Sequence, residues 1–298
     1  MRRERVVLWA LQGLLLGLPL LRGGRTPVAV VVGCATVVAL LVATIRARPR
    51  SAPGVGALAA FVALALATTV PLPPLALRLL SPATARLYAD MLPGWPGDGG
   101  WSVWRPLALD PWGVWAEVSR LAIAFGAFTV AVAYPWSTAD GPDDDARERV
   151  FGRLVLTLVA GGIVVALLGL VQQVLGVLPL ADTEALGGRA SGPFVNPNHF
   201  AAWLEMAIPA TLAYLAALAG RVRRRLARAA ESGRGIGVRA GRAWISAVIV
   251  HQRRLWAPLV TLAALAVMTA AHVASGSRAG SAALLIGQIG RASCRERV

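Results

Sequence analysis

The feature that most constrains the fold of this chain is a series of apolar runs, each close to twenty residues long. A helix needs about twenty apolar residues to cross the ~30 Å hydrocarbon core of a bilayer. Inside lipid every backbone polar group must be paired within the protein, so such runs form helices. Seven runs occur, and an eighth begins near residue 279; the seven lie at residues 6–21, 27–45, 55–77, 113–134, 154–180, 200–219 and 256–274. The sequence therefore predicts an all-α, polytopic transmembrane helix bundle.

Composition agrees with this prediction. Hydrophobic residues make up 56% of the chain and the mean hydropathy is +0.62, whereas about half is usual for a soluble domain. The formal net charge is +15, and all 30 basic residues are Arg. Because these Arg residues lie in short loops between the apolar runs, they favour a membrane protein over a nucleic-acid-binding one. The two cysteines, Cys34 and Cys294, provide neither a disulfide framework nor a Cys-based metal site.

The distribution of Arg predicts the orientation of the helices. The first run is predicted to be a retained helix rather than a signal peptide, since a second run follows at once and no clear cleavage site precedes Arg22. With the N-terminus in the cytoplasm, nineteen Arg residues lie on the inner side and eight on the outer side. The ten between 221 and 254 dominate this asymmetry, which follows the positive-inside rule. Arg22 and Arg25 argue weakly against this orientation, because it places them on the outer side.

Three segments then face outward, at residues 78–112, 181–199 and 275–278. The first carries several Trp among Pro and Gly, which favours either anchoring at the membrane interface or an aromatic platform for sugars; they are Trp95, Trp101, Trp104 and Trp112. The inward segment 140–153 mixes acids with Arg and is predicted to be a solvated loop that leads into a helix. No phosphate-binding loop with its Lys and no His pair at metal-ligand spacing is present.

The polar residues most suggestive of chemistry precede the sixth run. Asn196, Asn198 and His199 are crowded before residue 200, and Arg189 lies shortly upstream. An Asn here can cap the helix by accepting from free backbone N–H groups. A helix N-terminus also favours anions, so the same geometry beside an Arg suits a phosphate. The residues by themselves leave both interpretations open.

Arg278 is the second candidate, because small residues surround it: Ser275, Gly276, Ser277 and Gly280. Small neighbours permit close approach of a ligand, and the planar, permanently charged guanidinium binds phosphate. Snorkelling to lipid headgroups is the alternative. Glu205, Gln172 and Gln173 are polar residues within helices, where either a functional role or an interhelical hydrogen bond is typical.

These motifs resemble a known family. The stretch from Gly192 to Ala201, Gly-Pro-Phe-Val-Asn-Pro-Asn-His-Phe-Ala, is similar to the signature of the O-antigen ligase and polymerase superfamily. Ser-Gly-Ser-Arg-Ala-Gly, from Ser275 to Gly280, resembles its second motif. Gly-Leu-Val-Gln-Gln at 169–173 fits the helix that usually precedes them. The resemblance covers mainly residues 154–287.

The resemblance implies an inverting glycosyl transfer on the outer face of the cytoplasmic membrane, in lipopolysaccharide or other cell-envelope polysaccharide biosynthesis. The donor is a glycan on polyprenyl pyrophosphate, and the acceptor is lipid A core or another glycan. The resemblance implies no metal and no other cofactor. Carried onto this sequence, Arg278 and Arg189 hold the pyrophosphate, and Asn196 and Asn198 shape the site. The family places an acceptor-activating His in a large outer loop further on. The sequence contains no such loop, so His199 is the candidate for that role here.

Two alternatives remain. One is a protein oligosaccharyltransferase of the same superfamily. The other is a transporter or lipid flippase, which usually carries ionisable groups near the midplane and repeated halves, whereas the polar residues here gather at the outer mouth.

Three regions follow from this interpretation: N-terminal helices at 1–153, an incomplete ligase-related domain at 154–287, and a tail at 288–298. The tail resembles the translation of a common sequencing adaptor. We therefore expect the natural protein to continue beyond Gly287 and residues 1–287 alone to be inactive.

Overall fold

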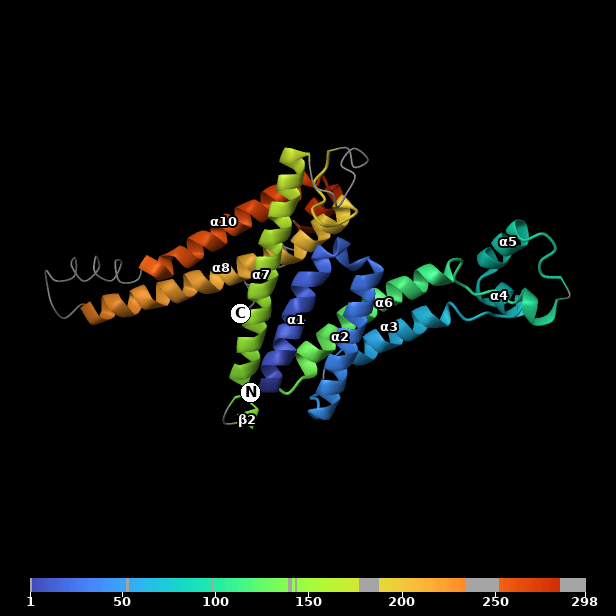
Figure 1. Ribbon diagram of the computed structural model, residues 1–298, viewed down its shortest axis with the longest axis horizontal. Coiled ribbons are helices and arrows are strands. Elements are labelled where there is room, and N and C mark those ends of the chain that lie inside the picture. Colours follow the sequence, from blue (N-terminus) through green and yellow to red (C-terminus); the bar gives the residue numbers. More distant parts are fainter. Residues whose placement is uncertain are drawn as a thin grey trace. The chain divides into compact units, whose positions relative to one another are not determined.

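The computed structural model describes residues 2–51, 54–97, 99–138, 141–142, 144–176, 188–233 and 252–284. Apart from a two-residue antiparallel pair, β1 (Ser137–Thr138) and β2 (Gly141–Pro142), its elements are helices (Figure 1). Five helical stretches are long and apolar enough to cross a membrane: Pro27–Arg46, Pro111–Ala133, Ala146–Leu175, Pro197–Arg221 and Trp256–Ala274. The all-α prediction is confirmed, and the chain is a multi-pass membrane protein.

Six of the predicted runs correspond to single helices: α1 (Arg2–Leu20), α2 (Pro27–Arg46), α6 (Pro111–Ala133), α7 (Asp144–Leu175), α8 (Pro197–Gly233) and α10 (Gln252–Ala274). The first, α1, is not one of the five apolar helices, since charged residues fill its first turn. Residues 278–284 are helical, as expected for the start of an eighth helix. The expected adaptor-like tail and most of the Arg-rich 221–254 segment lie outside the described residues.

The prediction of one continuous helix at 55–77 is wrong. The helix α3 (Val55–Ala67) is 13 residues long, and α4 (Pro74–Leu80) begins anew after an extended stretch. Pro71, Pro73 and Pro74 lack a backbone N–H and cannot continue a helix. Between them Leu72 pairs with Arg105 through two backbone hydrogen bonds of 3.0 and 3.1 Å. At 1.5 Å per residue, α3 spans only about 20 Å, less than the hydrocarbon core.

One compact unit comprises Pro27–Trp136. In it α2 and α3 pack against α6, while α4 packs against α5 (Pro82–Met91) (Figure 1). Leu77, Ala85 and Trp95 form a small core beneath the 3₁₀-helix η2 (Gly100–Val103).

That small core excludes Trp95 from both roles predicted for the Trp residues of this loop, interfacial anchoring and a platform for sugars. This residue is 9% exposed, its Nε1 donates to the Val103 carbonyl oxygen at 2.7 Å, and its ring lies 5.9 Å from that of Tyr88. Burial raises the pKa of the Tyr88 hydroxyl, and the charge of Arg105 lowers it in part. Trp95 therefore holds the loop together and offers no face to a sugar, whereas Trp112 is 84% exposed. The side chain of Trp101 lies outside the described residues.

The other unit comprises Met1–Thr26 and Ser137–Val298. Its helices α7, α8 and α10 pack against one another, and α1 packs along α7 (Figure 1). The helices approach closely at Gly162, where a Cβ would lie 2.7 Å from Ala207 Cβ and 2.9 Å from Met268 Sδ. Phe200, Leu204 and Met268 are fully buried in the core beside this contact. The expected functional division at residue 153 falls inside α7 and stays a prediction.

Candidate functional site

A buried glutamine on α7 fixes the start of the first motif. Gln172 is 1% exposed, and its Oε1 accepts from the backbone N–H groups of Ser191 and Gly192 at 3.1 and 2.7 Å. Its Nε2 donates to Ser191 Oγ at 3.1 Å. An amide side chain supplies both an acceptor and donors, so Gln172 satisfies a loop whose own N–H groups have no helix or sheet partner. It anchors the motif to the bundle.

Arg189 joins the two motifs. Its Nε donates to the Ser275 carbonyl oxygen at 2.7 Å, and its Nη2 donates to Asn198 Oδ1 at 3.1 Å. Beside it, the N–H of Ala190 donates to the carbonyl oxygen of Ala274 at 3.1 Å. The resemblance predicted that these segments, 86 positions apart, serve one site, and the structure places them in contact. We call these three hydrogen bonds the clasp.

The backbone N–H groups in the first turn of α8 already have hydrogen-bond acceptors within the chain. Asn196 Oδ1 accepts from the Asn198 N–H at 2.8 Å, and the Asn196 carbonyl oxygen accepts from the N–H groups of His199 and Phe200. Pro197, at the first helical position, has no N–H to satisfy. Asn196 is therefore the cap, whereas Asn198 faces Arg189. An anion at this end of α8 must then be bound chiefly by side chains.

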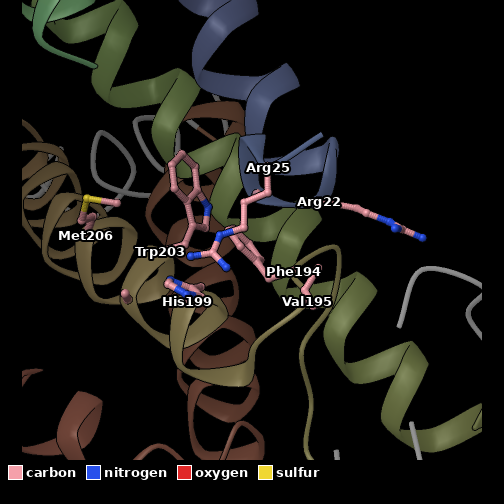
Figure 2. A pocket seen from close by; sticks show the side chains of 9 residues that line it. Arg22, Arg25, Phe194, Val195, His199, Trp203 and Met206 are labelled. Atoms are coloured by element: carbon pink, nitrogen blue, oxygen red, sulfur yellow. The ribbon is translucent and has the colours of Figure 1, made fainter. Parts of the chain in front are cut away.

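A cavity of about 150 Å³ opens beside this helix end (Figure 2). Three of its side chains are basic or ionisable and the others are mostly apolar; the lining consists of Arg22, Gly23, Arg25, Phe194, Val195, His199, Ala202, Trp203 and Met206. In Figure 2 the guanidinium of Arg25 points toward Trp203 and His199, whereas Arg22 extends away from them. We call this the cationic pocket.

The connection between α1 and α2 brings the two arginines to the pocket. It contains the short helix η1 (Arg22–Gly24), in which Arg22 and Gly23 have φ values of 54° and 68°. A Cβ at Gly23 would lie 2.5 Å from Phe194 Cδ1, so only glycine lets this turn close over the ring. In the sequence, Arg22 and Arg25 stand out only as exceptions to the predicted charge asymmetry. The two consecutive glycines between them were the signal for such a turn.

Arg278 lies near the clasp but outside the cationic pocket. It is exposed and begins the helical residues 278–284, where Ser277 Oγ accepts from the Gly280 N–H at 3.2 Å. Within the described part of the chain its guanidinium makes no side-chain hydrogen bond. Gly276, two residues before it, lies against Arg189: a Cβ there would be 3.2 Å from Arg189 Nε.

Of the predicted site residues, the structure thus brings together Arg189, Asn198 and the 275–278 turn, and separately places His199 in the pocket. Among the described residues no group of three or more His, Cys, Asp and Glu is arranged to hold a metal. The chain matches no known protein-family model, no curated protein and no solved structure.

Proposed function

We propose that this chain is part of a membrane glycosyltransferase that moves a glycan from a polyprenyl pyrophosphate carrier to an acceptor on the outer face of the cytoplasmic membrane. The acceptor is lipid A core or another glycan. The observation that carries the proposal is the cationic pocket, in which Arg25 from the α1–α2 connection and His199 from α8 converge beside the clasped motifs. A lipid-borne diphosphate needs such a combination of cations and apolar surface at the end of a helix bundle.

The dimensions of the cationic pocket suit the diphosphate rather than the whole donor. A volume of about 150 Å³ corresponds to roughly five water molecules. Arg25 supplies a planar fork suited to phosphate oxygens inside the pocket, and Arg22 adds positive charge at its edge. Trp203 Nε1 is a buried donor with no partner among the described residues, and it lies on the side of Arg25 (Figure 2). Val195 and Met206, both exposed, line the same cavity and suit the first isoprene units.

The transfer itself is a substitution at the sugar. The acceptor oxygen attacks the anomeric carbon, the bond from that carbon to the diphosphate oxygen breaks, and its electron pair leaves with the polyprenyl diphosphate. Fixed cations that face the leaving group lower the barrier by stabilising this charge. Arg189 has five N–H donors and uses two of them in the clasp, so three remain for the leaving group. The exposed Arg278 is the second cation on the clasp side.

Binding of the lipid by this chain tests the proposal. The chain is placed in nanodiscs, and its affinities for a polyprenyl diphosphate, the matching monophosphate and the matching alcohol are compared. We expect the diphosphate to bind most tightly. Replacement of a charge-assisted hydrogen bond costs about 1.5–3 kcal/mol, so Arg25→Ala should weaken binding about 10- to 100-fold.

Arg221→Ala is the matched control, since Arg221 is exposed much further along α8. It should leave the diphosphate affinity unchanged. Equal affinity for all three lipids, or equal losses in Arg25→Ala and Arg221→Ala, would contradict the proposal.

A further inference from the structure

The helices α4 and α5 form a hairpin that leaves the bundle at one end of α6. At 1.5 Å per residue, the 23 residues of α6 span about 35 Å, enough to cross the hydrocarbon core. At the C-terminal end of α6, the Arg50 N–H donates to the Ala133 carbonyl oxygen at 3.0 Å. Just before its N-terminal end, the Ala108 N–H donates to the Thr68 carbonyl oxygen at 2.9 Å. The hairpin begins after residue 68 and returns at residue 108, so it starts and ends at a boundary between lipid and water.

Exposed tryptophans and backbone pairing support this position. Trp112 and Trp115, in the first two turns of α6, are 84% and 50% exposed, and indole rings favour the headgroup level of a bilayer. Leu72 and Arg105, which pair through two backbone hydrogen bonds, join the two sides of the hairpin at its base. Figure 1 shows α4 and α5 beyond the adjacent ends of α3 and α6. The hairpin therefore extends from the headgroup region.

The hairpin is fixed to the chain that enters α6. The Tyr88 hydroxyl on α5 lies 3.2 and 3.4 Å from the carbonyl oxygens of Pro106 and Ala108, toward which it donates. The buried Leu77 joins α4 to the same small core as Trp95. The outward faces of α4 and α5 consequently have defined directions relative to α6.

The two helices of the hairpin expose different surfaces. On α4, Leu75, Leu79 and Leu80 are 70, 77 and 67% exposed, and we call them the leucine face. The exposed side chains of α5 are mostly small or charged: Pro82, Ala83, Arg86, Ala89, Asp90 and Met91. Large apolar side chains gathered on one exposed surface are unfavourable in water and indicate a site of contact. The leucine face therefore needs an apolar partner, whereas α5 suits water.

Continuity and charge identify lipid as that partner. The leucine face follows, along the chain, the exposed apolar residues of a membrane helix and its end: Phe61 and Leu64 on α3 and Val70 after it are 59, 67 and 53% exposed. The only charged residue of α4 is Arg78, which is exposed. A long Arg side chain beside apolar surface places its guanidinium among headgroups, where it binds phosphate.

We propose that α4 lies in the headgroup region of the bilayer at this end of α6, in the outer leaflet according to the predicted orientation. The leucine face enters the upper part of the acyl chains, Arg78 pairs with an anionic phospholipid, and α5 faces water. This inference is independent of the proposed glycosyl transfer, because it uses no residue of the cationic pocket or the clasp.

Fluorescence quenching in nanodiscs measures the depth of α4. In a chain with Cys34→Ala and Cys294→Ser, Leu79→Cys carries a nitrobenzoxadiazole probe, and Ala89→Cys, an exposed position on α5, carries the same probe as the matched control. We expect a phospholipid with a nitroxide high on its acyl chain to quench the Leu79 probe strongly and the Ala89 probe weakly. Iodide in the water should quench the two probes in the opposite order.

Arg78→Gln tests the pairing with anionic lipid. One basic side chain near the bilayer surface favours anionic over neutral lipid by up to about fivefold. In nanodiscs with equal amounts of phosphatidylglycerol and phosphatidylcholine, a nitroxide on the former should therefore quench the Leu79 probe more strongly than a nitroxide on the latter. Arg78→Gln should remove this difference. Arg86→Gln, which changes the exposed arginine of α5, is the matched control and should retain it.

Equal quenching of the Leu79 and Ala89 probes by lipid would overturn the inference. A Leu79 probe protected from both iodide and spin-labelled lipid would also overturn it, because a protein partner or a second copy of the chain would then cover the leucine face. A preference for phosphatidylglycerol that persists in Arg78→Gln would overturn the assignment of Arg78. If the labelled Leu79→Cys chain does not fold, as judged by thermal unfolding, a probe at Leu75→Cys makes the same comparison.

Discussion

Single polar side chains determine the shape of the site before any ligand arrives. Gln172 ties the first motif to α7, and Arg189 ties it to the turn after α10. Both act on backbone groups that no helix or sheet satisfies, so their removal leaves buried donors or acceptors without partners.

Gln172→Ala should destabilise the protein by about 1–3 kcal/mol, because the N–H groups of Ser191 and Gly192 lose their acceptor in a buried site. The measurement is the free energy of unfolding in mixed micelles. Gln173→Ala is the control: Gln173 is the next residue on α7 and is exposed, so its truncation should change this free energy by less than about 0.5 kcal/mol. Equal effects of the two variants would show that Gln172 does not anchor the motif.

At the scale of elements, close helix contact and helix breaks decide which segments meet. The helices α7, α8 and α10 approach one another at Gly162, where Ala207 and Met268 occupy the space of a side chain. Packing of membrane helices depends on small residues that let backbones approach. Helix breaks have the opposite effect, because they separate segments of one apolar run. Pro71, Pro73 and Pro74 prevent α3 from continuing, and Leu72 between them pairs with Arg105.

Gly162→Ala should lower the free energy of unfolding by about 1–3 kcal/mol, the usual cost of an extra methyl group in a well-packed interior. Gly152→Ala lies on the same helix with open space around its Cβ, and it should be neutral or stabilising by up to about 1 kcal/mol, since Ala favours helix over Gly. Unfolding of the two variants side by side gives the comparison. A Gly162→Ala protein as stable as Gly152→Ala would refute close packing at this point.

For the whole molecule, function depends on which side of the membrane the cationic pocket faces. The proposed donor presents its diphosphate at the outer face, so the pocket and the clasp must both lie there. The excess of Arg on the predicted inner side favours this orientation. Five of the Arg residues that dominate it, Arg221, Arg223, Arg224, Arg225 and Arg228, lie in the second half of α8, far along the helix from the pocket.

Cysteine labelling in intact cells measures the orientation. In a chain with Cys34→Ala and Cys294→Ser, Val195→Cys should react with a membrane-impermeant maleimide, because Val195 is 49% exposed and lines the pocket. Arg223→Cys, at an exposed position further along α8, should react only after lysis. The reverse pattern would place the pocket in the cytoplasm and exclude a donor bound from the outside.

The sequence by itself determined the all-α, membrane-embedded character of the chain and the places of most of its long helices, although α7 begins ten residues earlier and α8 ends fourteen residues later than predicted. This is so because run length and the need to pair backbone groups in lipid are local properties. Helix capping by an Asn at position 196 or 198 is equally local. The prolines at 71, 73 and 74 are a local signal for the break after Ala67. The prediction missed it because the run remains apolar through these residues.

Only the tertiary structure decided which side chains meet. Three examples are the burial of Trp95, the approach of Arg25 to His199, and the packing of Glu205 and His272 against Gly280. Each depends on how the helices are rotated and how closely they pack. Apolar runs with weak helical amphipathicity do not specify that rotation. It follows from contacts between residues far apart in the chain, such as those at Gly162 and Arg189.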